Sequence, residues 1–317
     1  MWKPRWSVYE IQNARYLVEH RTIGRRKNAK VLVDAAPGFL ARRWQGHYTQ
    51  KMTDNLRDDA LTLASLGVVA FAVADQTHEA LGHGLATLIT GGKLIALTTC
   101  YVNSAGGSAR WIPASGGLAN LAVGMIALAL LSILSKPLRL TRYFLVLVAA
   151  FNLFFASGYP AYSGIAAFGD WAAVISGLAP AWLWRTILVI IGVAGYYLSM
   201  QFIARAIRPF GSSLEGPTRD RLRRITLIPF LTALGLAFLG GLPNPRGWAM
   251  VFSAAVPAAA ACFGLTQMDH LPEAYRPNPV APAAEPIRRS IPWIVTGCLV
   301  AVLFVAILGP GIRFVRE

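Results

Sequence analysis

Long apolar segments separated by short basic loops are the feature that most restricts how this chain can fold. Its 317 residues are 55% hydrophobic and only 14% charged, whereas a soluble domain carries about 25% charged residues. A helix of about 20 mostly apolar residues can cross a bilayer, and it satisfies its own backbone groups where hydrocarbon cannot. The sequence therefore predicts an all-α polytopic membrane protein in a lipid bilayer.

We expect about seven transmembrane helices. Their approximate ranges are 60–90, 114–135, 143–158, 182–204, 225–242, 248–268 and 291–309. Residues 159–178 are expected to form either an eighth element or a segment that enters the membrane without crossing it. The chain then has three parts, which are a basic N-terminal arm (1–58), a transmembrane domain (59–309) with a candidate catalytic core at 70–175, and a C-terminal tail (310–317).

Positive charge gathers in particular parts of the sequence. The formal net charge is +15, and residues 1–57 contain 12 Lys or Arg against 4 Asp or Glu. Basic residues recur at 136–142 and 205–224, and a loop of mixed charge spans 269–289. Because cytoplasmic loops are enriched in Lys and Arg, we expect all four regions on the cytoplasmic side, with the arm in the cytoplasm or at the membrane interface. No nucleic-acid partner is expected, because aromatic and basic residues do not alternate beyond the arm.

Seven crossings would place the C-terminus on the opposite side of the membrane, where Arg313 and Arg316 are minor exceptions to the charge rule. The first residues lack the apolar core of a secretory signal. For a compact chain of this kind we expect the inner membrane of a bacterium.

One apolar segment carries ionisable residues, in the run ADQTHEALGHG at 74–84. Each such residue in a spanning helix costs about 2.5–3.5 kcal/mol on insertion scales, so it usually marks a working site. A His-Glu pair with a second His one turn later is how a helix presents two zinc ligands beside a general base. His78, Glu79 and His83 supply these side chains, and Glu79 is the candidate base.

The two histidines lie five positions apart, one more than in the usual zinc helix. In an α-helix, positions i and i+4 are about 40° apart around the axis, and i and i+5 about 140°. A π-helical bulge, eased by Gly82, would bring His78 and His83 nearly into line. Alternatively, Glu79 and His83 are the ligands, on a face that Asp75 continues. Without a metal, these side chains would form a buried cluster that packs helices or relays protons.

A third ligand has to come from elsewhere, because a catalytic zinc site uses about three protein ligands. Asp170 is the only acidic residue between Glu79 and Glu215. A lone carboxylate in an apolar segment is costly unless it is paired or bound to a cation. We therefore expect Asp170 to supply the third ligand of a Zn²⁺ site, beside His83 and either His78 or Glu79. The alternative is that Asp170 caps a helix in a loop.

Asn120 follows a run of small residues at the start of the second expected span. Small residues let helices approach closely, and an amide there could donate a hydrogen bond to a substrate backbone or an oxyanion. We therefore include Asn120 among the candidate catalytic residues. It could equally bind a neighbouring helix, and the same two alternatives hold for Asn152.

The segment after the first span differs from the rest. Gly91-Gly92 is a stop signal for the helix, and residues 93–102 are rich in β-branched and aromatic side chains. We expect a short membrane-associated β-strand or hairpin here, shielded by protein or facing a water-filled cavity. Its edge would accept an extended substrate through main-chain hydrogen bonds.

The order of these features resembles the site-2 protease family of intramembrane zinc metalloproteases. That family has a His-Glu-rich zinc helix, a Gly-Gly turn, a membrane-associated β-hairpin, a Gly-Pro-like run with an Asn at the head of the next helix, and a later Asp that precedes Gly. The corresponding residues here are, in order, His78-Glu79 with His83, Gly91-Gly92, 93–102, Gly116 to Asn120, and Gly169-Asp170. The zinc motif is one residue longer than His-Glu-x-x-His, and Asp170 follows its glycine instead of preceding it.

This resemblance implies that His78, His83 and Asp170 bind zinc and that Glu79 activates a water. The substrate would be a transmembrane protein, cleaved in or beside its membrane-spanning segment. The rival hypotheses are a proton-coupled transporter, which would use the same buried side chains as a relay, and a non-catalytic membrane scaffold. A zinc hydrolase of lipid amides would need the same ligands.

Overall fold

The computed structural model describes residues 58–134, 139–213, 216–217, 219–275 and 285–314. Within these ranges, seven helices are long and apolar enough to cross a membrane, which confirms the predicted all-α polytopic membrane fold. Apart from Asp58, the predicted N-terminal arm lies outside the described residues, as does Lys136.

The seven candidate spans include several changes of helical type. In chain order they are Ala60–Ile89 (α4, Ala60–Gln76; η1, Thr77–Gly84; α5, Leu85–Ile89), α6 (Trp111–Ile133), α7 (Arg139–Ala166), α9 (Ala181–Gly211), α10 (Arg219–Gly241), Trp248–His270 (α11, Trp248–Met250; η2, Val251–Ala255; α12, Val256–Ala261; η3, Cys262–His270) and Ile291–Leu308 (α14, Ile291–Leu303; η4, Phe304–Leu308). Segments η1, η2 and η4 are π-helical, and η3 is a 3-10 helix.

The remaining elements are short. The helices are α8 (Asp170–Val174) and α13 (Pro272–Tyr275), and the strands are β1 (Lys93–Leu97), β2 (Val102–Ala105), β3 (Ser212–Ser213), β4 (Gly216–Pro217) and β5 (Ile312–Arg313).

The third span is longer than the sequence predicted. We expected it to end near residue 158, but α7 continues through Pro160 to Ala166. A proline in a membrane helix is tolerated because neighbouring groups can satisfy the freed carbonyl. Residues 159–178 therefore form no separate spanning element. They complete α7 and then form the five-residue helix α8 in the loop before α9.

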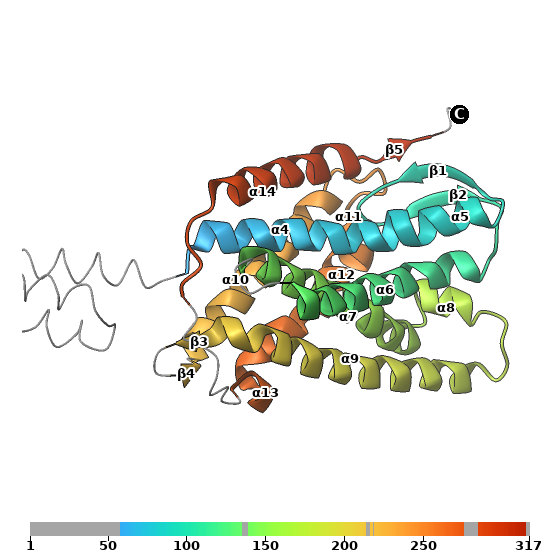
Figure 1. Ribbon diagram of the computed structural model, residues 1–317. Coiled ribbons are helices and arrows are strands. Elements are labelled where there is room, and N and C mark those ends of the chain that lie inside the picture. The colour runs from blue at the N-terminus through green and yellow to red at the C-terminus, as the bar shows by residue number, and fades with distance from the viewer. Residues whose placement is uncertain (1–57, 135–138, 214–215, 218, 276–284, 315–317) are drawn as a thin grey trace, which may run out of the picture. The chain divides into compact units, whose positions relative to one another are not determined.

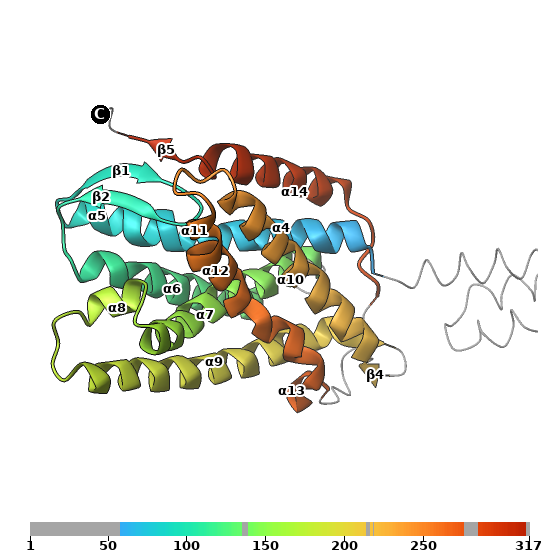
Figure 2. The same ribbon diagram turned by 180° about the vertical axis from the view of Figure 1, so that it is seen from behind.

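Helix α7 lies among α4, α6 and α9 (Figures 1 and 2). Of its most apolar 18-residue stretch, 67% is buried inside the protein, against 11% for Ile291–Leu308. Phe71 of α4 packs edge-on against Phe151 and Phe155 of α7, with ring centroids 5.9 and 5.8 Å apart. Such aromatic pairs add about 0.5–1.5 kcal/mol each beyond the area they bury. They hold α4 against α7 just before the polar run begins.

The predicted hairpin is present and belongs to a three-stranded antiparallel sheet in the order β2-β1-β5. Strands β1 and β2 form the hairpin and contact η1. The other edge of β1 pairs with β5, with Ala96 opposite Arg313 and Leu97 opposite Ile312. The sequence did not predict this second pairing, because a two-residue strand in a C-terminal tail has no periodicity to detect.

Ion pairs join several elements at the end of the bundle where α4 begins. Asp58 is only 3% exposed and accepts two hydrogen bonds of 3.0 Å from the guanidinium of Arg221 on α10. The backbone N–H of Ile287 also donates to Asp58, at 2.7 Å. Beside this pair, Arg289 bonds Asp59 at 3.1 Å. The starts of α4, α10 and α14 therefore meet at one end.

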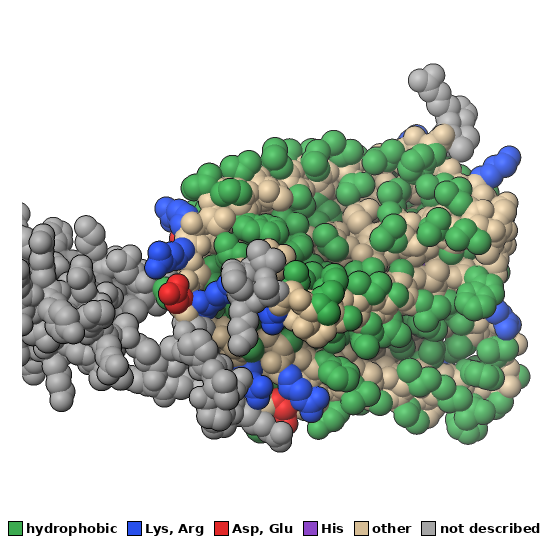
Figure 3. Space-filling view, in the orientation of Figure 1, with side chains coloured by type: hydrophobic (Ala, Val, Ile, Leu, Met, Phe, Trp, Pro, Cys, Tyr) green, Lys and Arg blue, Asp and Glu red, His purple; other side chains and the backbone are tan. Residues whose placement is uncertain are grey.

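The surface has the distribution of charge expected of a membrane protein. Lys and Arg side chains gather near the end where α4 begins, and hydrophobic side chains cover much of the flank between the two ends (Figure 3). The hairpin, α5 and α8 lie at the other end (Figure 1). If the basic end faces the cytoplasm, as the charge rule predicts, the hairpin end lies on the outer side.

The Asp58–Arg221 pair predicts a difference between two arginine substitutions. Arg221→Ala should lower the free energy of unfolding by about 3–5 kcal/mol, because it leaves a buried carboxylate unpaired. Arg289→Ala is the control and should cost about 0–1 kcal/mol, because the Arg289 side chain is 61% exposed. Unfolding in mixed micelles measures both values. Equal losses of unfolding free energy in the two variants would show that the buried Asp58–Arg221 pair stabilises the fold no more than the exposed Asp59–Arg289 pair.

Candidate metal centre

The five-residue spacing of the two histidines is accommodated by a change of helical type. The first span is α-helical to Gln76 and π-helical over η1, Thr77–Gly84. This widened turn places the rings of His78 and His83 with centroids 4.7 Å apart. The π-helical bulge, the first of the two arrangements considered from the sequence, is therefore the one present.

Asp170 completes the cluster from the loop between α7 and α9. Its Oδ2 lies 2.9 Å from Nε2 of His78 and 3.1 Å from Nε2 of His83. One ligand atom from each of the three residues lies within 4.8 Å of the others. In a tetrahedral site with bonds of about 2.0–2.2 Å, ligand atoms lie about 3.3 Å apart. The two distances to Asp170 are near this value, and the ligand types are those of a metal site.

Glycines bring the second span close to the widened turn. A Cβ atom added to Gly82 would lie 2.5 Å from Cα of Gly116 on α6, so α6 and η1 approach backbone to backbone. A Cβ added to Gly116 would lie 2.7 Å from ring atoms of both His78 and His83. The two imidazoles therefore rest on the bare backbone of α6.

Gly169 and Tyr159 position Asp170. Gly169 precedes α8 with φ of +85°, a conformation that favours glycine. A Cβ added there would lie 2.7 Å from the hydroxyl of Tyr159. The carboxylate of Asp170 does not cap α8; it bonds the histidines instead. Burial opposes its ionisation, but the contacts with His78 and His83 hold the pKa of Asp170 well below its usual range.

A chain of hydrogen bonds fixes the proton on His78. Asn120 Nδ2 donates to the carbonyl of Ala74 at 2.8 Å, which sets the orientation of the amide, since a carbonyl can only accept. The same nitrogen donates to Asn152 Oδ1 at 2.9 Å. Asn120 Oδ1 then faces His78 Nδ1 at 2.8 Å, so Nδ1 carries the proton and donates. His78 Nε2 is left to face Asp170.

His83 is held in the same way by a backbone group. Its Nδ1 lies 2.7 Å from the carbonyl oxygen of Ile112 at the start of α6, so Nδ1 is again the donor. In neutral rings, the lone pairs of both Nε2 atoms would therefore face one carboxylate oxygen. A single cation among the three atoms satisfies all of them at once. Protons alone would require two imidazolium ions on the same oxygen.

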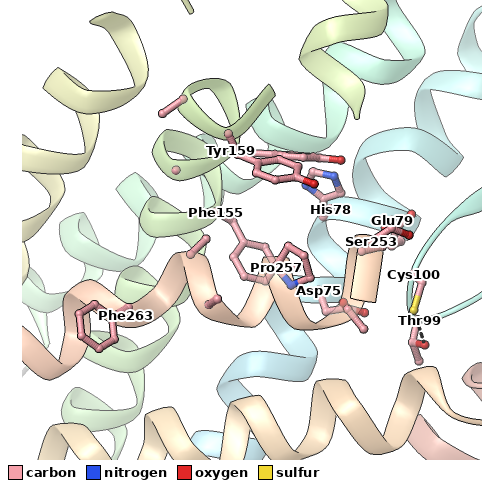
Figure 4. Close-up of a pocket in the computed structure, with 18 of the residues that line it drawn as sticks. Asp75, His78, Glu79, Thr99, Cys100, Phe155, Tyr159, Ser253, Pro257 and Phe263 are labelled. Carbon is pink, nitrogen blue, oxygen red and sulfur yellow. Dashed lines mark hydrogen bonds between the residues drawn. The ribbon is translucent and has the colours of Figure 1, made fainter. Parts of the chain in front are cut away.

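Glu79 lies next to this cluster and faces a cavity of about 560 Å³ (Figure 4). The side chain is buried, and its Oε2 has no hydrogen-bond partner among the described residues. A buried carboxylate oxygen without a partner is costly, and a water or substrate group in the cavity would supply one. Glu79 is not part of the three-residue ligand cluster. The alternative in which it replaces His78 as a ligand is therefore not the arrangement found.

The cavity is otherwise mostly apolar and lies between the first span, α7 and the sixth span, with Tyr196 of α9 at its wall. Its polar lining includes Asp75, which accepts a hydrogen bond of 2.8 Å from Gln76, and Thr99 and Cys100 from the hairpin turn. Burial raises the pKa of Cys100 to about 12, so its thiol is protonated at neutral pH and is no nucleophile.

Asn120 requires a correction. The sequence offered it as a catalytic donor or as a link to a neighbouring helix. It is fully buried, and its polar atoms bond Ala74, Asn152 and His78. It therefore positions His78 and has no amide proton directed at a substrate. The Ile112 carbonyl and the contact of Gly116 with the rings were missed, because backbone groups and glycines give no sequence signal of this kind.

These features define a class: a multi-pass helical membrane protein with a cluster of two buried histidines and a half-buried aspartate that could hold a metal ion. A scan against protein-family models, a search of curated proteins and a search of solved structures each found no match to this chain.

The contact of Gly116 with both rings gives a direct prediction. Gly116→Ala should weaken metal binding by at least about tenfold, because the new methyl group displaces imidazoles whose other nitrogens are already fixed. The control is Gly235→Ala on α10, where an added Cβ meets nothing within 4 Å. Metal titration of the purified variants measures both affinities. Native affinity in Gly116→Ala would contradict the packing described.

The amide chain gives a second prediction. Asn120→Leu removes the acceptor for His78 Nδ1 and should lower metal affinity about 10–100-fold, as is typical when a ligand loses its orienting partner. Asn103→Leu, on β2 and not among the three residues of the cluster, is the control. The affinities come from competition with a chromogenic chelator. An unchanged affinity in Asn120→Leu would show that His78 needs no orienting acceptor.

Proposed function

We propose that this protein is an intramembrane zinc metallopeptidase that hydrolyses a peptide bond in or beside a membrane-spanning segment of a protein substrate. The observation that carries the proposal is the convergence of His78, His83 and Asp170 beside Glu79, which lines a cavity and whose Oε2 has no hydrogen-bond partner among the described residues. The order of these motifs, which resembles that of site-2 proteases, supports the same activity. The inner membrane of a bacterium is the proposed location.

Each side chain has a defined task in this proposal. His78, His83 and Asp170 hold the ion, and Asn120 and the Ile112 carbonyl keep both Nε2 atoms unprotonated and aimed at it. Zinc in such a site polarises a carbonyl and makes a water nucleophilic at neutral pH. Glu79 takes the proton of the attacking water on Oε2 and delivers it to the nitrogen of the leaving amine.

The cavity supports an apolar substrate. Its lining combines aromatic rings, such as Phe155, Tyr159 and Phe263, with the small residues of the sixth span. Apolar side chains of a membrane segment fit such a space, and contacts between charges are stronger beside buried side chains such as those of His78, His83 and Glu79 than in water. A lipid amide would fit a similar space, so the substrate assay has to include one.

Zinc content and hydrolysis, measured on the same variants, test the proposal. Purified native protein should bind about one zinc ion. His83→Ala and Asp170→Ala should each lower the affinity for zinc. The loss should exceed the factor of about 10–100 that is typical when a residue orienting a metal ligand is replaced. Glu79→Gln should keep its metal while kcat falls about 10²–10⁴-fold on a membrane-segment peptide.

His270→Ala is the matched control, because the His270 side chain is 54% exposed and is not in the cluster. A native protein that binds no metal would reject the proposal. Proton flux through reconstituted vesicles without zinc would favour the transporter. Full cellular function in Glu79→Gln would favour the scaffold, and cleavage of a lipid amide but no peptide would change the substrate class.

A further inference from the structure

Residues 308–314 follow the edge of β1 over several positions. The N–H of Thr99 donates to the carbonyl of Leu308 at 3.2 Å, and the N–H of Phe314 donates to the carbonyl of Ile95 at 2.9 Å. Between these two bonds, β5 pairs antiparallel with β1. Residues 308–314 thus occupy, with their own backbone, the edge that was expected from the sequence to accept an extended substrate.

This edge leads to the candidate site. Two residues beyond the end of β1, Thr99 lines the cavity together with Cys100, Asp75 and Glu79 (Figure 4). An extended peptide that replaced β5 would therefore continue from the sheet towards the carboxylate of Glu79.

The C-terminal span and β5 together have the form expected of a substrate. Ile291–Leu308 is a helix that packs on α4 at the periphery of the bundle, with 11% of its apolar stretch buried. The helix ends at Gly309-Pro310-Gly311, where Gly311 has φ of +93°, and the chain then becomes extended. A membrane segment has to make the same change from helix to strand before its peptide bond is accessible to hydrolysis.

We propose that residues 312–314 are an internal occupant of the substrate edge of β1 and that they limit access of other peptides to it. If the protein is the proposed peptidase, this occupant would inhibit it, and that part of the inference rests on the proposed function. The exchange of β5 for another peptide on the edge of β1 does not depend on that function.

The bound segment has the properties of an occupant that can leave. Strand β5 is two residues long, and its side chains are exposed, with Ile312 at 38% and the adjacent Phe314 at 52%. Main-chain hydrogen bonds supply most of the contact, and these do not depend on sequence. A tether to α14 raises the effective concentration of the segment to about the millimolar range, so that a free peptide competes poorly while the segment is intact.

A pair of substitutions at one position separates backbone from side chain. Phe314→Pro removes the N–H that donates to Ile95, whereas Phe314→Ala keeps it and removes only the exposed ring. A third variant ends the chain after Gly311. The zinc content of all three should equal that of the native protein, which shows that the site is intact.

The probe is a fluorescent peptide with the sequence of residues 308–317, added to each protein in a Glu79→Gln background and followed by fluorescence anisotropy. The truncated protein and Phe314→Pro should bind it at least about tenfold more tightly than the native chain, because the tethered competitor is lost or weakened. Phe314→Ala should remain within about threefold of native. The same peptide with the Phe314→Pro change should bind weakly to every protein.

Equal affinities in the native and truncated proteins would place the peptide elsewhere, such as on the outer edge of β2, and would overturn the proposal. Failure of every protein to bind the peptide would overturn it as well. Because binding is measured without hydrolysis, these results are independent of whether the protein is a peptidase. If it is, hydrolysis of a membrane-segment peptide should be faster in Phe314→Pro than in Phe314→Ala.

Discussion

The rest of the site depends on one geometric constraint, the five-residue separation of His78 and His83. In an α-helix this spacing would direct the two rings about 140° apart. The π-helical segment η1 brings the rings to a centroid distance of 4.7 Å. Widened turns of this kind are rare and occur frequently at functional sites. Here the widened turn makes one helix present two imidazoles to a single carboxylate.

The surrounding structure stabilises this local geometry. Gly82 and Gly116 let α6 approach the widened turn, so that the rings rest on backbone. Asn120, Asn152 and the Ile112 carbonyl fix which ring nitrogens carry protons. The aromatic contacts between α4 and α7 hold the first span in place. Each contact restricts a motion of the histidine rings or of the first span that a weakly packed site would allow.

The sequence predicted those features that depend on local composition. Apolar runs predicted the number and approximate ranges of the spans, and Gly91-Gly92 predicted the end of the first. Asp170 was predicted to be a partner of the histidines, because an unpaired carboxylate in an apolar segment is costly. The length of α7 was underestimated because Pro160 is a breaker in water but is tolerated in a membrane helix.

Features that depend on distant contacts could not be predicted in this way. The choice between two roles for Asn120 required knowing that Ala74 and Asn152 lie beside it. The pairing of β5 with β1 joins residues more than 200 positions apart in the sequence. Both are settled by tertiary packing, for which a single sequence carries no periodic signal.

X-ray absorption at the zinc edge of the metal-loaded protein tests the central claim most directly, because it reports the ligands themselves. The structure predicts a first shell of nitrogen and oxygen at about 2.0–2.2 Å, with scattering from two imidazole rings. A spectrum with sulfur ligands, or with fewer than two imidazoles, would contradict the claim that the widened helix joins His78, His83 and Asp170 around one ion.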